Sequence, residues 1–316
     1  MRTLRAGVVG VGYLGRFHAQ KYAALENVDL IGVADVSRER ADEVAAEVGT
    51  ASYTDYRELL RQVDLVSIVV PTQYHFPVAK ECLEAGCHIL LEKPVTQTVE
   101  EADALIRLAA DRQLVFQVGH LERFNPAIMA LKGVLKGPLF IESHRLAPFK
   151  PRGTDVNVVL DLMIHDIDII LNMVPSSVKL VNSVGVPVLS NEVDIANARL
   201  QFENGCVANV TASRVSREAM RKIRIFQPDA YISIDYQERK ISIYRKGGEG
   251  FPIPGLPKVT MEEKSFDQGD ALMTEIKAFV EAVDTGSTPP VTGEDGKRAL
   301  ELALQINQKL WHEVKA

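Results

Sequence analysis

The first 120 residues alternate between short apolar runs and longer amphipathic runs. The apolar runs are almost continuous, as in parallel strands buried on both faces, and predict strands over 5–9, 29–34, 64–70, 87–91 and 114–118. Between them, apolar residues at helical spacing predict helices over 13–25, 37–48, 55–61, 74–86 and 98–111. This alternation predicts an α/β fold with a doubly wound parallel sheet.

After residue 120 the pattern changes to alternating apolar and polar positions, which is typical of antiparallel strands with one covered face. It predicts strands over 139–147, 178–188, 193–203, 206–215, 220–227, 230–235 and 240–245, and an irregular segment over 247–260. Helices are predicted over 126–136, 161–173, 270–284 and 294–314. The chain is therefore predicted to form one domain over 1–120 and a second α/β domain over 121–316, whose mostly antiparallel sheet is open and whose last helix can pack back on the first domain.

The first predicted strand runs into a glycine-rich turn that contains Gly10, Gly12 and Gly15 in the spacing Gly-x-Gly-x-x-Gly. Glycine at these positions permits a tight bend, close approach of a pyrophosphate and close packing of helix on strand. The helix predicted after the turn begins with Tyr13, Leu14 and Gly15. Its N-terminus presents backbone N–H groups that can bind phosphates. The turn predicts a dinucleotide-binding Rossmann domain.

Asp35 ends the second predicted strand twenty residues after Gly15, where an acid bonds the ribose hydroxyls of an adenosine. A carboxylate at this position favours NAD over NADP because it repels a 2′-phosphate. Ser37 and Arg38 follow directly, and both can contact a phosphate, so NADP stays the less favoured alternative. Arg38 is included among the predicted cofactor residues.

Further polar residues follow the ends of later strands and are expected to face the same crevice. Pro71, Thr72 and His75 follow the third of the strands predicted above, and Glu92 and Lys93 follow the next, so all five are predicted to contact the cofactor. Proline follows Lys93, constrains its backbone and allows a cis bond. Lys93 is predicted to act near the reactive end of the dinucleotide, the alternative being an ordinary surface lysine.

Asp161 and His165 are four residues apart, so a helix places them on one face. A carboxylate beside an imidazole suits a group that transfers protons. The alternatives are a helix N-cap for Asp161 and a structural role for His165. Asp166 and Asp168 are expected to point elsewhere on the helix, and no third ligand at a matching spacing supports a metal site.

Basic and polar residues gather around the predicted domain junction and the strand that follows it. The guanidinium group of an arginine can bind two phosphate oxygens at once, so arginines in a cleft suit a phosphate ligand. The alternative is that these are ordinary solvated arginines at the surface. The predicted substrate-binding residues are His120, Arg123, Asn125, Arg145, Arg152 and His165.

Composition narrows the partners of this chain. Its 316 residues are 46% hydrophobic and 25% charged, which is average for a globular protein, and its net charge of −6 argues against nucleic-acid and membrane partners. No apolar run reaches the length of a membrane span, and the N-terminus leads straight into the first strand. Cys82, Cys87 and Cys206 lack a zinc-type spacing and are expected to be reduced, mostly buried thiols in a cytoplasmic protein.

Taken together, the glycine turn, Pro71-Thr72, Glu92-Lys93-Pro94, Gly119-His120 and Asp161 with His165 resemble the Gfo/Idh/MocA family of nicotinamide-dependent sugar oxidoreductases. The resemblance covers nearly the whole chain. It implies a dinucleotide-binding domain followed by an α/β domain whose open sheet builds homodimers or homotetramers. It also implies that Lys93, Asp161 and His165 are the catalytic set.

Two longer stretches, 118–127 and 145–168, are similar to the branch of this family that oxidises the 3-hydroxyl of UDP-N-acetylglucosamine. The resemblance implies a nucleotide-sugar substrate and a PLP-dependent aminotransferase that acts on the keto product. The alternatives are a dehydrogenase of a free sugar, an inositol or a UDP-N-acetylhexosaminuronate, and a non-catalytic regulator that senses dinucleotides. Residue patterns do not decide between Lys93 and His165 as the base.

Overall fold

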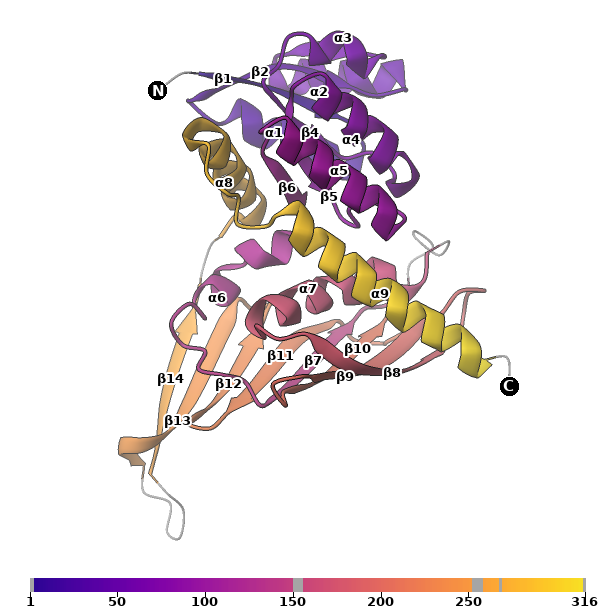
Figure 1. The fold of residues 1–316 in the computed structure, drawn as a ribbon. Helices are drawn as coiled ribbons and strands as arrows, with labels where there is room; N and C mark the ends of the chain where they lie inside the picture. The colour runs from indigo at the N-terminus through magenta and orange to yellow at the C-terminus, as the bar shows by residue number, and fades with distance from the viewer. Residues whose placement is uncertain (1–2, 150–155, 252–257, 267–268, 315–316) are drawn as a thin grey trace. The chain divides into compact units, whose positions relative to one another are not determined.

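The computed structural model describes residues 3–149, 156–251, 258–266 and 269–314. The chain forms two compact units, which are described separately (Figure 1). Unit 1 comprises residues 1–121 and 270–300, and unit 2 comprises residues 122–269 and 301–316. The division differs from the predicted domains because residues 270–300 cluster with the first part of the chain.

Unit 1 is built on a six-stranded sheet in the order β3-β2-β1-β4-β5-β6, with every neighbouring pair parallel. This is the strand order of a Rossmann fold, and β1 lies at the point where the order reverses. The helices and strands of this unit are β1 Leu4–Val9, α1 Tyr13–Ala23, β2 Val28–Ala34, α2 Arg38–Val48, β3 Ala51–Tyr53, α3 Tyr56–Leu60, β4 Leu65–Ile68, η1 Thr72–Tyr74, α4 His75–Glu84, β5 His88–Glu92, α5 Val99–Asp111, β6 Phe116–Gly119, α8 Ala271–Thr285 and the start of α9 Gly293–Val314.

Local signals in the sequence set the ends of these helices. The Ser37 side chain accepts a hydrogen bond from the Arg40 backbone and caps α2. Thr98 and Glu101 form a capping box at the start of α5. Gly49 ends α2 in a left-handed conformation, with φ of 71°, that favours glycine.

The core of unit 1 joins its N-terminal strands to α8, which comes from the far end of the sequence. Tyr22 of α1 is fully buried and packs in one apolar cluster with Ile276, Phe279 and Val280 of α8. The same cluster contains residues of β1, β2, β4 and β5. Burial of this apolar face explains why residues 270–300 belong to unit 1.

Unit 2 is built on an eight-stranded sheet in the order β14-β13-β12-β11-β7-β10-β9-β8. Only the β7–β10 pair is parallel among its described pairs, so the predicted mostly antiparallel sheet is confirmed. The helices and strands of this unit are α6 Pro126–Met129, β7 Phe140–Leu146, the π-helical turn η3 Val159–Met163, α7 Ile164–Met173, β8 Val178–Val186, β9 Ile195–Phe202, β10 Val207–Ser213, β11 Met220–Gln227, β12 Ala230–Asp235, β13 Lys240–Phe251, β14 Val259–Ser265 and the end of α9. The 3-10 turn η2 Leu121–Phe124 joins the two units in sequence.

Four features differ from the predicted elements. The helix expected over 126–136 ends at Met129, and Gly133 beyond it has a left-handed φ of 79° that interrupts a helix. Strand β3 has only three residues, too few for a pattern. Strand β14 begins inside the segment 247–260 that was predicted to be irregular. It lies at the edge of its sheet and is mostly exposed, so its sequence lacks the alternation of apolar and polar residues that predicts a strand. The helix expected from Asp161 begins with the π-helical turn at Val159.

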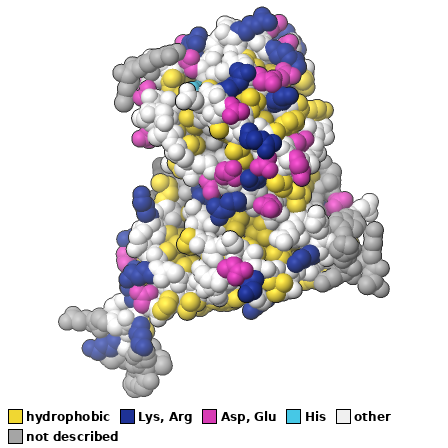
Figure 2. Space-filling view, in the orientation of Figure 1, with side chains coloured by type: hydrophobic (Ala, Val, Ile, Leu, Met, Phe, Trp, Pro, Cys, Tyr) yellow, Lys and Arg dark blue, Asp and Glu magenta, His cyan; other side chains and the backbone are white. Residues whose placement is uncertain are grey.

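The surface and the cysteines agree with the composition. Basic and acidic side chains are interspersed on the face shown in Figure 2. Cys82, Cys87 and Cys206 are buried free thiols, and burial raises the pKa of Cys87 and of Cys206 to about 11. None of the described helices combines the length and apolar character needed to cross a bilayer.

Candidate active site

The glycine turn lies between the carboxyl end of β1 and the start of α1. Gly10 has a φ of 86°, and a Cβ on it would lie 2.7 Å from the Val69 carbonyl oxygen. A Cβ on Gly15 would lie 1.9 Å from the Gly10 carbonyl oxygen, so the helix closes tightly on the turn. A Cβ on Gly12, by contrast, would meet none of the described atoms within 4 Å.

Asp35 joins the end of β2 to this turn. One carboxylate oxygen accepts the Val11 backbone N–H at 3.0 Å, and the other accepts the Ser37 backbone N–H at 2.9 Å. A carboxylate offers about four acceptor positions, so acceptor capacity remains for ribose hydroxyls. The exposed Arg38 side chain donates to the Thr54 hydroxyl at 3.1 Å and lies 3.8 Å from Asp42.

His75 has a structural role in the loop after β4. Its ring is 1% exposed and lies between two backbone carbonyls, with Nδ1 2.8 Å from the Pro94 oxygen and Nε2 2.9 Å from the Val70 oxygen. Burial lowers the pKa of His75 in spite of these contacts. These contacts support the turn around Pro94, and the cofactor contact of His75 stays a prediction. Pro71 is exposed and Thr72 is half-buried at the same strand end.

Glu92 and Lys93 follow β5 at the carboxyl edge of the sheet, and the Lys93–Pro94 bond is cis. The Glu92 carboxylate accepts the Lys93 backbone N–H at 3.3 Å and contacts the His18 ring at 3.2 Å. Burial opposes ionisation of Glu92, but the hydrogen bond from His18 and the positive charges around it hold its pKa below the ordinary value. A Cβ on Gly119 would lie 3.0 Å from this carboxyl group, so a glycine is needed beside it.

His120 follows Gly119 at the end of β6 and is 1% exposed. Its backbone N–H donates to the Val118 carbonyl at 2.8 Å. The predicted residues Gly10, Asp35, Lys93 and His120 thus all stand at the carboxyl ends of parallel strands of unit 1, as the strand pattern predicts.

The other catalytic candidates lie in unit 2. Asp161 belongs to the π-helical turn η3, and His165 is in the first turn of α7. The Asn157 side chain caps this segment by accepting the backbone N–H groups of Val159 and Leu160, so Asp161 is not the cap. Both Asp161 and His165 are half-buried. Single-turn π-helical bulges are rare and occur frequently at functional sites.

The aspartates after His165 anchor α7. Asp166 is 1% exposed, accepts Arg145 Nε at 2.6 Å and accepts the Ser143 hydroxyl at 2.8 Å. Glu122 binds the same guanidinium at 3.0 Å, and Arg145 lies over the ring of Tyr236 with 5.7 Å to its centroid. These groups fix α7 on strand β7.

A second buried pair holds the next turn of the same helix. Arg123 donates to both oxygens of Asp168, each at 2.7 Å. Asn125 caps α6 by accepting the Ala127 backbone N–H at 3.1 Å. Arg123, Asn125 and Arg145 each bond a protein partner, and their role in substrate binding stays a prediction. Arg152 lies outside the described residues.

Two family models together match most of this chain. Residues 4–120 match the model of an oxidoreductase family with an NAD-binding Rossmann fold, and residues 132–309 match the model of its C-terminal alpha/beta domain. This chain belongs to the Gfo/Idh/MocA oxidoreductase family. The resemblance of its motifs is therefore confirmed, and so are an oxidoreductase class and an NAD-binding first domain.

Two relatives in the Gfo/Idh/MocA family show how far the similarity extends. UDP-N-acetylglucosamine 3-dehydrogenase from Acidithiobacillus ferrooxidans is 45% identical over 97% of both chains. A solved structure of that enzyme superposes with a TM-score of 0.93 at 44% identity and covers 98% of both chains. The NAD-dependent scyllo-inositol 2-dehydrogenase from Bacillus subtilis is 28% identical over 95% of this chain and 92% of its own.

The glycine turn fits the NAD of a Gfo/Idh/MocA protein. Open space beside Gly12 leaves room for a pyrophosphate, and no side chain among the described residues caps the N-terminus of α1. Tyr13 and Leu14 at that terminus are 67% and 43% exposed. Asp35 follows the end of the neighbouring strand β2, and its bond to the adenosine ribose stays a prediction.

Two alanine variants separate binding from folding at this turn. Gly12→Ala is expected to weaken NAD binding by at least about tenfold with little change in melting temperature, because the added methyl occupies only the open space. Gly15→Ala is expected to destabilise the protein by about 2–3 kcal/mol as well, because its Cβ meets backbone. Isothermal titration with NAD and thermal unfolding measure the two effects. Equal melting temperatures for the two variants would contradict the prediction.

The interior of unit 1 holds one carboxyl group that the sequence did not single out. Glu275 of α8 is fully buried, and neither carboxyl oxygen has a hydrogen-bond partner among the described residues. Burial, reinforced by the negative charge of Glu92, raises the pKa of Glu275 well above its ordinary value. Glu275 therefore keeps its proton to a higher pH than an ordinary glutamate does.

This acid makes stability depend on pH in a defined direction. Above the ordinary Glu pKa the unfolded chain releases the Glu275 proton and the folded chain keeps it, so wild-type stability falls as pH rises. The stability advantage of Glu275→Gln is expected to grow by about 1.4 kcal/mol per pH unit between pH 5 and the folded pKa. Chemical denaturation across this pH range measures it, with Glu281→Gln on the exposed face of α8 as control. A difference that is independent of pH would show that Glu275 is ionised.

The sequence pattern also left other groups of the site unassigned. His18 contacts both Ser67 and Glu92. Asp166, Asp168 and Glu122 bind the two arginines. A signal existed for His18, because it shares the apolar face of α1 with Tyr22. The aspartates gave no such signal, since their partners come from elements distant in sequence.

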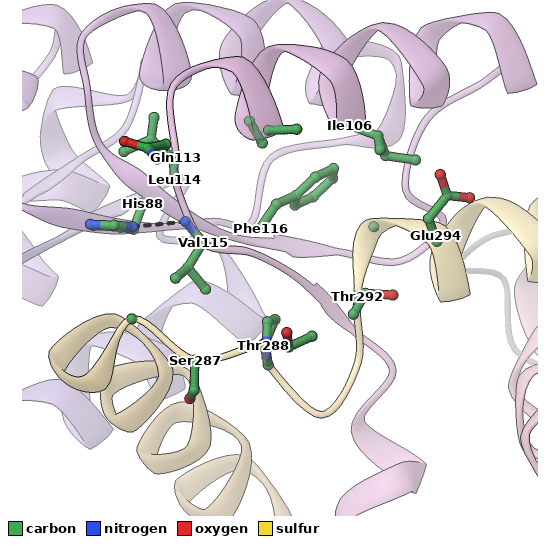
Figure 3. Close-up of a pocket in the computed structure, with 15 residues that line it drawn as sticks. His88, Ile106, Gln113, Leu114, Val115, Phe116, Ser287, Thr288, Thr292 and Glu294 are labelled. Atoms are coloured by element: carbon green, nitrogen blue, oxygen red, sulfur yellow. Dashed lines mark hydrogen bonds between the residues drawn. The ribbon is translucent and has the colours of Figure 1, made fainter.

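A separate pocket of about 390 Å³ lies at the amino ends of β5 and β6, the opposite edge of the sheet from Lys93 (Figure 3). His88 Nδ1 accepts the Val115 backbone N–H at 2.8 Å there, and burial lowers the pKa of His88. Phe116, Thr288 and Glu294 also line it. None of the predicted site residues belongs to this pocket. Within the described ranges, no three His, Cys, Asp or Glu side chains form a group that could hold a metal ion.

Proposed function

We propose that this protein is an NAD-dependent dehydrogenase that oxidises the 3-hydroxyl of UDP-N-acetylglucosamine to a ketone. The observation that carries the proposal is its 45% identity over 97% of both chains to the Acidithiobacillus ferrooxidans enzyme of that name. The TM-score of 0.93 supports it, because the similarity extends through the second unit as well as the common NAD-binding domain.

Within this proposal the catalytic residues are Lys93, His165 and Asp161. Bound NAD⁺ supplies the hydride acceptor for the carbinol carbon. Lys93 Nζ hydrogen-bonds the reacting oxygen, and His165 accepts the hydroxyl proton or relays it while Asp161 orients the ring. If His165 is the base, Lys93 stays charged and stabilises the developing alkoxide. Support comes from the fixed backbone on each side, Lys93 beside Glu92 and His165 on the anchored helix α7.

The same proposal covers the partners of the protein. A 3-keto sugar is a substrate for a PLP-dependent aminotransferase, so an enzyme of that class is proposed to consume the product. We further propose that the protein works in the cytoplasm as a homodimer or homotetramer. Size-exclusion chromatography with light scattering measures the oligomeric state.

A substrate panel tests the activity. NADH formation is measured with UDP-N-acetylglucosamine, a UDP-N-acetylhexosaminuronate, scyllo-inositol and free N-acetylglucosamine, each with NAD⁺ and with NADP⁺. We expect the largest kcat/KM with UDP-N-acetylglucosamine and NAD⁺, and a 3-keto product by NMR. A larger kcat/KM with an inositol or a free sugar would contradict the proposed substrate. Tighter binding of NADPH than of NADH would contradict NAD as the proposed cofactor.

A further inference from the structure

Beneath Lys93, a line of buried polar side chains crosses unit 1 from α1 to the end of β5. Tyr22 and His18 come from α1, Ser67 from β4 and Glu92 from β5. Tyr22, His18 and Ser67 are each at most 1% exposed. Neither the predicted cofactor residues nor the proposed catalytic roles use the first three of these groups. A buried polar group is costly unless it is hydrogen-bonded, so the line calls for an explanation.

The four side chains form one continuous hydrogen-bond chain. The Tyr22 hydroxyl lies 2.9 Å from the Ser67 hydroxyl, and the Ser67 hydroxyl lies 3.1 Å from His18 Nδ1. His18 Nε2 lies 3.2 Å from Glu92 Oε1, and Glu92 Oε2 accepts the Lys93 backbone N–H at 3.3 Å. Each member contacts the next, and the last contact is with the backbone of the proposed catalytic lysine.

The chemistry of the groups gives this chain a direction. An ionised carboxylate only accepts hydrogen bonds, so His18 Nε2 carries a hydrogen and donates to Glu92. With a neutral imidazole, Nδ1 then accepts from the Ser67 hydroxyl. The Ser67 oxygen in turn accepts from the Tyr22 hydroxyl. With His18 in this tautomer, each hydrogen bond of the series is donated in the direction of Glu92.

Both oxygens of Glu92 are thus held from inside the unit, one by His18 and the other by the Lys93 backbone. Gly119 permits the carboxyl group to lie against β6, since a Cβ there would approach it to 3.0 Å. A carboxylate fixed at both oxygens and on one face has little freedom to rotate. This carboxylate binds the backbone N–H of Lys93, so the position of Lys93 depends on the hydrogen-bond chain.

We propose that the chain Tyr22–Ser67–His18–Glu92 is a positioning device for Lys93, in which His18, Ser67 and Tyr22 act through Glu92 and do not touch substrate. The proposal rests on the proposed function for the role of Lys93. Catalytic rate is sensitive to the placement of a reacting group, because a misplacement of about 1 Å can lower the rate about 100-fold.

The first test does not depend on enzyme activity and uses the full-length protein without substrate. Selective ¹⁵N labelling of histidine reports the His18 tautomer, and selective ¹³C labelling of lysine reports the Lys93 Cε resonance. We expect a protonated Nε2 and an unprotonated Nδ1 on His18. Ser67→Ala is expected to shift the Lys93 Cε resonance, whereas Ser183→Ala is not. Ser183 is a matched control, because it is a buried serine in a strand and its hydroxyl donates to the Ile306 carbonyl in unit 2.

The second test is kinetic. His18→Leu is expected to lower kcat about 10- to 100-fold with KM for the sugar within about twofold, and His18→Gln, whose amide can still donate to Glu92, is expected to recover most of the rate. Tyr22→Phe serves as a milder variant that keeps the shape of the buried ring. We also expect a shifted pH profile of kcat in Ser67→Ala and an unchanged profile in Ser183→Ala.

The outcomes separate this proposal from the proposed function. An unprotonated His18 Nε2, or a Lys93 Cε resonance that is the same in Ser67→Ala and wild type, overturns the positioning device whatever the substrate is. Wild-type kcat and pH profile in both Ser67→Ala and His18→Leu overturn it as well. Absence of NADH formation in the wild type with the expected tautomer and resonance shifts overturns the proposed function alone.

Discussion

Replacing Lys93 by methionine is expected to lower kcat by about 10²- to 10⁴-fold, while the dissociation constant for NAD stays within about twofold. Methionine keeps the length and apolar stem of the side chain but removes the ammonium group that is proposed to bond the reacting oxygen. General acid–base catalysis by a positioned side chain contributes an effect of this size. Single-turnover hydride transfer, followed by NADH absorbance, measures the chemical step directly.

Lys80→Met is the matched control for Lys93→Met. Lys80 is an exposed lysine of the same unit, 3.8 Å from Glu84 on α4, and its loss is expected to leave kcat unchanged. His165→Asn tests the second member of the catalytic set in the same assay. Near-wild-type transfer rates in both Lys93→Met and His165→Asn would remove these residues from the mechanism.

The second large effect is expected at Arg145. Arg145→Met leaves the buried carboxylate of Asp166 and the half-buried carboxylate of Glu122 without the guanidinium that both of them bind. Removing one partner of a buried pair costs about 3–5 kcal/mol, mainly because the other charge stays buried and uncompensated. Burial lowers the pKa of Arg145, but the negative charges of Asp166 and Glu122 raise it more, so its pKa lies above the ordinary value. Chemical denaturation and hydrogen exchange of the α7 amides measure the loss.

Arg224→Met on the neighbouring strand β11 provides the comparison. Arg224 lies 3.3 Å from Glu142, and both side chains are partly exposed, at 43% and 30%. An exposed pair contributes about 0–1 kcal/mol, so this variant is expected to unfold almost as the wild type does. The double variant Arg145→Met with Asp166→Asn is expected to recover part of the loss, because it removes one buried charge. Equal losses in Arg145→Met and Arg224→Met would contradict a structural role for the buried pair.

Prediction of the NAD half from sequence succeeded because its signals are local. Gly10, Gly12 and Gly15 lie within six residues of one another, and Asp35 follows the end of the next strand. The strands of this unit are nearly continuously apolar because they are buried on both faces. These features follow from the chain a few residues at a time, so the pattern predicted the Rossmann fold.

The arginines have protein partners that a local argument does not identify. Arg123 and Arg145 have the same sequence character as phosphate-binding arginines. Their partners Asp168 and Asp166 are 45 and 21 residues away, and the sequence gives no sign of the pairing. Only the packing of α7 on β7 decides that these guanidinium groups are used inside the protein. The same holds for His75, whose carbonyl partners lie in two separate loops.

The sequence by itself thus determined most strands and helices of both units, the glycine turn, the acid after β2 and the family of the protein. The tertiary structure decided which polar residues lie at the strand ends and which are bonded to protein partners in the interior. It also brought His18, Ser67 and Glu92 together from three elements and placed Glu275 of α8 in the core of unit 1. The physical reason is that secondary structure follows residue spacing, whereas desolvation and pairing of a polar group depend on which distant elements close over it.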